Sequence, residues 1–166
     1  WSEVDLAGWI EKISGVPVIL ENDANVAALG EAVHGAGKGA GVVFYVTLGS
    51  GAGGGLVVNG RLYHGATMGE AEFGHLRLDK SGRTVESSCS GWAVNTKIRS
   101  AVAANPNGVL AGLLANHHDA ESKVLARALT ANDSEAWDIF NDTIDDLVFG
   151  LSHVTHLFHP DRIVLG

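Results

Sequence analysis

The chain has 166 residues, of which 46% are hydrophobic and 18% are charged, and its net charge is -8 with histidine neutral. This length and composition predict one globular lobe with a sizeable core, and they exclude disorder as the main description. Only 11 Lys and Arg residues stand against 19 Asp and Glu residues, so we expect no nucleic-acid surface in this segment.

The sequence also indicates where the protein works. Cys89 is the only cysteine, so no intrachain disulfide can form, and a reducing, cytoplasmic setting fits. No apolar run approaches the ~20 residues that a membrane-spanning helix needs, and no signal peptide is recognisable. The chain starts at Trp1 rather than at a methionine and stops at Gly166, directly after a strand-like segment. We therefore expect a fragment with both flanks missing.

The first elements in the chain are a helix, a strand and a second helix. Ser2 and Asp5 resemble a capping box for a helix over about 6–13, which a Gly-Val-Pro sequence ends. Val-Ile-Leu at 18–20 predicts a short buried strand. A second helix over about 23–34 follows directly.

A glycine-rich hairpin comes next. Residues 42–48 predict a strand and 56–58 its returning partner, with the glycine-rich turn between them. Asn59–Gly60 is a strong signal for another tight turn. Residues 73–78 predict a further strand, which ends in a turn at 79–82.

After about residue 90 the apolar residues recur with helical periodicity. The expected helices span about 91–103, 109–116, 120–130 and 134–158, and a strand follows at 162–165. The first half of the last helix is rich in acidic residues, which complement the helix dipole as a solvated face. His153, His156 and His159 lie near its other end, where we interpret them as structural rather than as metal ligands.

The most informative segment is the glycine-rich loop between the two central strands. It contains G-x-G-x-x-G at Gly49, Gly51 and Gly54, but a strand follows instead of the helix that a dinucleotide-binding turn requires. Backbone N–H groups can still converge on a phosphate there, and the hydroxyls of Thr47 and Ser50 add donors. A flexible hairpin tip is the alternative. The candidate phosphate-binding residues are Thr47, Gly49, Ser50, Gly51, Gly53 and Gly54.

Two other segments carry side chains suited to a polar ligand. Asn22 and Asp23 lie where the predicted strand enters a helix, so Asp23 could act as a general base and Asn22 could bind a hydroxyl group. Asn and Asp are also preferred helix caps, and from these residues alone the cap is the favoured interpretation. Glu72 and His75 could both reach a ligand, although taken alone they are more simply surface side chains.

Taken in order, the motifs resemble the ROK family. They are Glu-Asn-Asp-Ala-Asn at 21–25, Gly-Ala-Gly-Lys-Gly at 35–39, Thr-Leu-Gly-Ser-Gly at 47–51 and Glu-Phe-Gly-His at 72–75. The family includes bacterial glucokinases, fructokinases and N-acetylhexosamine kinases, and sugar-responsive repressors. The resemblance covers nearly the whole chain and implies an α/β, actin-like ATPase (ribonuclease H-like) fold. Residues 1–166 would form a single lobe, the larger C-terminal one, with a helical second half.

The resemblance also implies a role for each candidate residue. Asp23 matches the catalytic base that takes the proton of the attacking sugar hydroxyl. Asn22, Glu72, His75 and Glu86 match ligands of the sugar. The glycine loop matches the second of two phosphate-binding loops, so ATP and Mg²⁺ are the implied cofactors, with the Mg²⁺ ligands mostly outside this chain.

Two departures from the family pattern matter. The family often has a zinc site made by the histidine of Glu-x-Gly-His and a loop with three cysteines, whereas the segment 76–91 here holds only Cys89. Aligning Ser90 with the family's Ser-Gly after that loop places Glu86 on the loop's final glutamate. The Asp-x-Gly-Gly-Thr phosphate loop, which the family carries near its N-terminus, is also absent from the sequence.

These features predict a lobe of a glucokinase-like, ATP-dependent hexose kinase. We expect the isolated chain to be inactive, because half of the groups that position the reactants would be missing. The alternative is a ROK-type sugar-responsive repressor, but repressors usually keep the cysteine loop. A catalytically inactive relative is a third interpretation. The expected partners are a hexose and a second copy of the chain in a homodimer, without a membrane and without nucleic acid in this segment.

The sequence predicts that no structural zinc is bound at His75. One cysteine cannot supply three thiolates, and a closed structural zinc site usually has four protein ligands. Metal analysis of the purified protein should therefore find well under one zinc per chain. Stoichiometric zinc that resists a chelator would contradict this prediction and would show either that residues 76–91 were misaligned with the family or that another set of ligands binds the metal.

Overall fold

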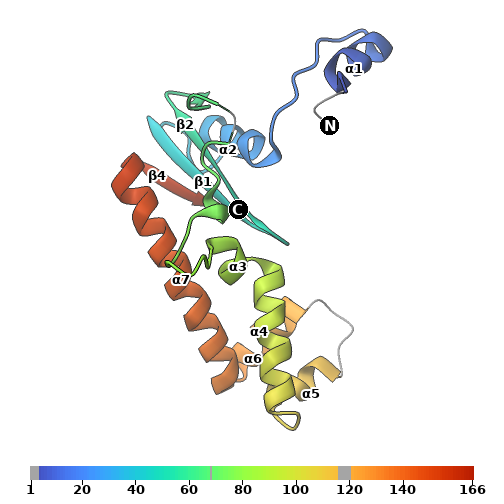
Figure 1. The fold of residues 1–166 in the computed structure, drawn as a ribbon, viewed down its shortest axis with the longest axis vertical. Helices are drawn as coiled ribbons and strands as arrows, with labels where there is room; N and C mark the ends of the chain where they lie inside the picture. Colours follow the sequence, from blue (N-terminus) through green and yellow to red (C-terminus); the bar gives the residue numbers. More distant parts are fainter. Residues whose placement is uncertain (1–3, 68, 116–120) are drawn as a thin grey trace.

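The computed structural model describes residues 4–67, 69–115 and 121–166. A four-stranded sheet combines three strands from the first half of the chain with one from its end (Figure 1). The strand order is β3-β2-β1-β4. The strands are β1 (Val42–Leu48), β2 (Ala52–Val58), β3 (Arg61–Leu62) and β4 (Arg162–Leu165). The first three pair antiparallel, whereas β4 pairs parallel to β1. The chain thus returns to its first strand after the whole helical half.

Both faces of β1 are buried, which explains its nearly continuous apolar sequence. Val43 and Tyr45 belong to the cluster under helix α2 (Asp23–Val33), together with Ala28 and Ala32. Phe44 and Val46 alternate with them, as strand geometry requires, and point to the opposite face. There they meet the side chains of Phe73, Val85, Leu147 and Val154. The sheet is therefore covered by α2 on one side and by α7 with α3 on the other.

Helix α7 (Ser134–Phe158) connects this sheet to a separate helical cluster (Figure 1). Its C-terminal half packs on the sheet, and its N-terminal half packs with α4 (Gly91–Ala104), α5 (Val109–Ala115) and α6 (Glu121–Thr130). The core of that cluster is Ile98, Leu110, Val124, Leu125, Ala128, Ala136 and Ile139. The predicted change to a helical second half is confirmed. The expected helix end at 116 and helix start at 120 lie outside the described residues, and the other bounds are within a residue of those expected.

Helix α1 (Leu6–Ser14) stands away from the rest of the protein (Figure 1). Asp5 caps its start, as its carboxylate accepts the N–H of Gly8 at 3.0 Å, and Gly15 ends it with a left-handed backbone. Ser2, the other half of the predicted capping box, lies outside the described residues. None of the helices in the described ranges is long and apolar enough to cross a membrane.

Two strand predictions are wrong. Residues 18–20 form no strand, and the side chain of Ile19 is 91% exposed, because this segment runs between α1 and α2 without a neighbouring strand in the described chain. Residues 73–78 form a short 3₁₀ helix, η1 (Phe73–His75), and then one bridge between Arg77 and Thr84. Apolar residues in a short run cannot by themselves distinguish a strand from a tight turn packed on the core.

Sequence reasoning also missed two features. Helix α3 (Val85–Cys89) has a capping box between Thr84 and Ser87, and the serine at the third helical position, in place of the usual Glu or Gln, made its sequence signal weak. Strand β2 begins at Ala52, so the glycines at 53–55 pair with β1 and lie within the sheet rather than at the hairpin tip.

The glycines of β2 allow the neighbouring segments to approach closely. A Cβ at Gly55 would lie 2.6 Å from Cβ of Ala28 and 3.1 Å from the carbonyl oxygen of Ala24, both on α2. A Cβ at Gly54, on the other face, would lie 2.6 Å from the carbonyl oxygen of Ala71. Real Cβ atoms do not tolerate such distances, so glycine is required at both positions.

We predict that Gly55→Ala destabilises the protein by about 1–3 kcal/mol, because α2 must move off the sheet. Gly30→Ala is the matched control on α2, where a Cβ meets nothing within 4 Å. That substitution should stabilise the helix by about 0.5–1 kcal/mol. Urea unfolding of the two variants measures both effects, and equal changes in unfolding free energy would show that close packing at Gly55 is unimportant.

Candidate functional site

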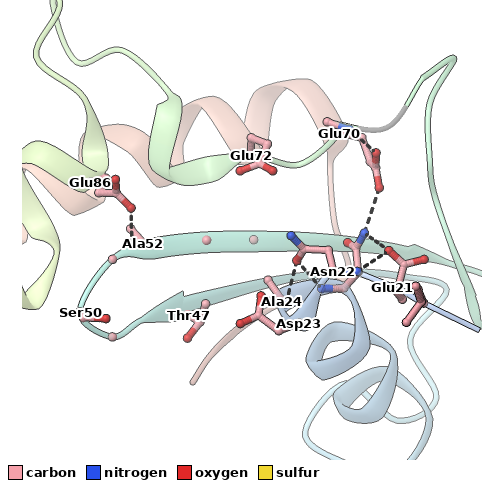
Figure 2. A pocket seen from close by; sticks show the side chains of 17 residues that line it. Glu21, Asn22, Asp23, Ala24, Thr47, Ser50, Ala52, Glu70, Glu72 and Glu86 are labelled. Carbon is pink, nitrogen blue, oxygen red and sulfur yellow. Dashed lines mark hydrogen bonds between the residues drawn. The ribbon is translucent and has the colours of Figure 1, made fainter. Parts of the chain in front are cut away.

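A cavity of about 750 Å³ lies at the glycine-rich end of the β1–β2 hairpin. Its walls come from the first turn of α2, from residues 69–72 and from Glu86 of α3 (Figure 2). The polar side chains that line it are Glu21, Asn22, Asp23, Asn25, Thr47, Ser50, Glu70, Glu72 and Glu86. Residues as distant in sequence as Leu20 and Glu86 thus contribute to one cavity.

The first turn of α2 places Asn22 and Asp23 at the cavity. Oδ1 of Asn22 accepts the N–H groups of Ala24 at 2.8 Å and Asn25 at 3.3 Å, so Asn22 is the helix cap. Asp23 is the first helical residue, and its exposed carboxylate accepts the N–H of Ala24 with one oxygen, at 2.8 Å. The cap interpretation is therefore right for Asn22, while Asp23 keeps one carboxylate oxygen for a ligand.

Hydrogen bonds with α3 and α4 fix the tip of the β1–β2 hairpin, and two backbone N–H groups of the tip stay unpaired within the described chain. The N–H of Gly91, at the start of α4, donates to the carbonyl oxygen of Gly49 at 2.8 Å. The N–H of Ala52 donates to Oε2 of Glu86 at 2.9 Å. Within the described residues, no protein atom accepts the N–H groups of Ser50 and Gly51. Two unpaired N–H groups at an exposed turn are suited to a phosphate, so the tip fits the nucleotide phosphates that the resemblance implies.

A smaller hollow of about 270 Å³ adjoins the hairpin tip and is bordered by Trp92. The side chain of Trp92 is 73% exposed, and its backbone N–H donates to the carbonyl oxygen of Ser50 at 3.4 Å. Sequence reasoning did not single out this indole, because it lies within the periodicity of an ordinary helix.

Four side chains at the edge of the cavity form one hydrogen-bonded group, which we call the Asn25 cluster: Glu21, Asn25, His64 and Glu70. The amide nitrogen of Asn25 donates to Oε1 of Glu21 and to Oε1 of Glu70, both at 3.0 Å. The ring of His64 lies between the same two carboxylates, with Nδ1 3.1 Å from Glu70 and Nε2 3.3 Å from Glu21.

The hydrogen bonds of this cluster keep both of its carboxylates ionised. The bond from Asn25 is the largest of the effects that hold the pKa of Glu21 below its usual range. Burial raises the pKa of Glu70, but hydrogen bonds from its own N–H, from Asn25, from the N–H of Gly69 and from His64 outweigh burial and lower that pKa. The cavity therefore has a negatively charged edge at neutral pH.

The structure brings together all but one of the residues that the sequence singled out. Asn22, Asp23, Glu72 and Glu86 line the cavity with the loop residues Thr47, Gly49, Ser50, Gly51, Gly53 and Gly54. His75 is exposed on η1 and does not line it, so its role as a sugar ligand stays a prediction from the sequence. Figure 2 shows the carboxylate of Asp23 and the hydroxyl of Thr47 on one side, with Glu72 and Glu86 opposite.

The Asn25 cluster was missed by sequence reasoning. Asn25 and Glu70 stand beside predicted site residues, and that proximity was the only available signal. Nothing in the sequence marks His64, which reaches the cluster from the loop after β3. A partnership over 45 positions, such as that of Asn25 with Glu70, exists only in the folded chain.

Residues 76–91, which the family resemblance aligns with the cysteine loop, offer poor zinc ligands. Burial, followed by the nearby charge of Asp146, raises the pKa of the Cys89 thiol to about 11. Within the described ranges, no three His, Cys, Asp or Glu side chains are grouped so that they could hold a metal. A thiolate zinc site needs deprotonated cysteines, which the raised pKa of Cys89 disfavours, and the absence of a structural zinc stays a prediction.

A hydrogen-bonded turn occupies that segment instead. The carboxylate of Asp79 accepts the Ser81 hydroxyl at 2.6 Å and the N–H groups of Ser81, Gly82 and Arg83. These bonds, with that of the Ser81 hydroxyl the largest effect, hold the pKa of Asp79 well below its usual range. Arg83 then pairs with Asp146 of α7, which links the turn to the long helix.

The relatives of this chain include both enzymes and regulators. It is 30% identical over 175 residues to a glucokinase of Halalkalibacterium halodurans, a match that covers 100% of this chain and 53% of that protein. A xylose repressor of Bacillus spizizenii is 27% identical over 166 residues, covering 99% of this chain and 41% of the repressor. The chain thus spans about half the length of the curated relatives it matches.

A solved structure matches the fold closely. The ROK family glucokinase from Streptomyces griseus, in complex with glucose and AMPPNP, superposes with a TM-score of 0.82 at 32% identity, covering 97% of this chain and 55% of that chain. This confirms the α/β, actin-like ATPase fold expected from the motifs. The family model for ROK proteins matches residues 1–166, from the first residue to the last. The chain belongs to the ROK family.

Proposed function

We propose that this chain is the larger lobe of an ATP-dependent hexose kinase in which Asp23 is the general base. The observation that carries this proposal is one cavity with a carboxylate at one end and unpaired N–H groups at the other. Phosphoryl transfer to a hydroxyl needs a group that orients the nucleophile and a site that holds the phosphates. A glucokinase relative, and a solved glucokinase that holds glucose and AMPPNP, support the same function.

The charge of the cavity favours a neutral sugar. Its lining includes five carboxylates and, within the described chain, neither Lys nor Arg. Carboxylates accept hydrogen bonds from hydroxyl groups, which suits a polyhydroxyl ligand, and they repel any anion that no bound cation neutralises. The five are Glu21, Asp23, Glu70, Glu72 and Glu86. A neutral hexose is therefore the substrate class that fits this chemistry.

Each proposed sugar ligand has a polar atom that is available to bind a sugar hydroxyl. Nδ2 of Asn22 can donate to a sugar hydroxyl, because its cap bonds use Oδ1 alone. Glu86 uses Oε2 for the N–H of Ala52, which leaves Oε1 as an acceptor. Glu72 lines the cavity directly. We expect these side chains to hold the sugar while Asp23 accepts the proton of the attacking hydroxyl.

The hairpin tip would hold the nucleotide phosphates. The N–H groups of Ser50 and Gly51 and the hydroxyl of Thr47 are the donors on offer. ATP supplies the γ-phosphoryl group, and Mg²⁺ offsets the charge of its phosphates. We propose that the rest of the full-length protein supplies the other phosphate contacts and most of the Mg²⁺ ligands. We also propose that the active protein is a homodimer.

A sugar-responsive repressor is the second candidate function. The xylose repressor relative is the finding that favours it, and the sugar side of the cavity would serve either function. Two measurements on the full-length protein separate them: ADP release with a panel of hexoses, and DNA binding with and without each sugar. Sugar-dependent DNA binding without phosphorylation of any hexose would favour the repressor.

We predict that Asp23→Asn in the full-length protein lowers kcat by about 10²–10⁴-fold, the usual contribution of a general base. The two side chains are nearly isosteric, so the melting temperature and the sugar affinity should change little. A coupled ADP-release assay and thermal unfolding measure these quantities.

Asp138→Asn is the matched control, because Asp138 is exposed on α7 and does not line the cavity. It should retain full turnover. Near-normal turnover in Asp23→Asn would show that another group takes the proton.

A further inference from the structure

The segment that carries Glu72 has a backbone that alanine does not favour. Ala71 has φ of 54°, in the left-handed region, where the Cβ of an L-residue crowds its own backbone. Glu70 and Glu72 flank it, and the two carboxylates reach different parts of the cavity (Figure 2). If Ala71 relaxed to an ordinary conformation, Glu72 would turn away from its present direction.

Contacts on both sides of Ala71 prevent that relaxation. On the C-terminal side, Phe73 is buried against Phe44, with ring centroids 6.1 Å apart, and its N–H donates to the carbonyl oxygen of Ala71 at 2.7 Å. On the N-terminal side, Glu70 is bonded to Asn25, to His64 and to the N–H of Gly69. Glu70 is thus the anchor that fixes the start of this turn.

The anchor is attached to the helix that carries the proposed base. Asn25 is only 6% exposed, and both hydrogens of its amide nitrogen are used, one by Glu21 and one by Glu70. Loss of the Glu70 carboxylate would leave a buried donor without a partner, which proteins avoid. The Asn25 cluster therefore ties residues 69–72 to the first turn of α2, two residues after Asp23.

We propose that Glu70 is a positioning residue, which acts through the strained Ala71 to aim Glu72 at the sugar. The cluster sets the separation of the two cavity walls, the one with Asp23 and the one with Glu72. This inference rests on the proposed function of the cavity as a sugar site. It assigns to Glu70 a role in sugar affinity without contact with the nucleotide.

Steady-state kinetics of the full-length protein test this role. Glu70→Ala should raise the KM for the hexose about tenfold, the loss expected for a charged hydrogen-bonded anchor, and leave the KM for ATP unchanged. Glu70→Gln keeps an acceptor for Asn25 and should recover most of the affinity. Glu31→Ala is the control, because Glu31 also accepts a backbone N–H but lies at the far end of α2; it should change neither KM.

A double variant tests the path through Ala71. Glycine adopts the left-handed region without penalty, so Ala71→Gly should restore part of the sugar affinity lost in Glu70→Ala. Independent effects of the two substitutions, or a further loss in the double variant, would overturn the role of Ala71.

Hydrogen exchange separates this inference from the proposed function, because it requires no activity. In Glu70→Ala, amides of residues 71–76 should exchange faster, while those of β1 remain unchanged. Unaltered exchange at 71–76, an unaltered hexose KM, or equal increases in both KM values would overturn the positioning role. Failure of the unaltered protein to bind any hexose would instead overturn the proposed function, and the exchange result would still decide whether Glu70 is the anchor.

Discussion

The site depends on the close packing of helix α2 and of the turn at Ala71 against the glycines of β2. At Gly55 helix α2 lies so near that an added Cβ would be 2.6 Å from Ala28, and at Gly54 the carbonyl oxygen of Ala71 is equally near from the other face. Strand β2 thus lies between the helix that carries Asp23 and the turn that carries Glu72, and its glycines allow both to pack closely against it. Any side chain there would separate the two walls, and the polar groups could no longer converge.

Several side chains hold the fold with one atom and face the cavity with another. Asn22 caps α2 through Oδ1, and Glu86 holds the hairpin through Oε2, while the second polar atom of each stays available. Groups fixed in this way lose little conformational freedom when a ligand binds, which is the advantage of a preorganised site. The cap and ligand interpretations of such residues are therefore compatible, although they look like alternatives in the sequence.

The predictions failed where a short run of residues gave the only signal. Residues 73–78 have the apolar content of a strand, but burial of Phe73 and the hydrogen bonds around Ala71 fold them into a tight turn. Residues 18–20 look equally strand-like, yet Ile19 is almost fully exposed. In both cases the deciding factor is the presence or absence of a neighbour distant in sequence, which local patterns do not encode.

The sequence by itself determined the long elements, the family resemblance and most cavity residues, because helical periodicity, strand patterning and the spacing of short motifs are local properties. The long helix at 134–158 and the strand at 42–48 are found where they were expected. Only the tertiary structure decided that His75 lies outside the cavity and that Glu70 and His64 join Asn25 at its edge. Those relations depend on the path of a loop between distant elements, and the physical reason is that contacts across 45 positions form only when the whole chain packs.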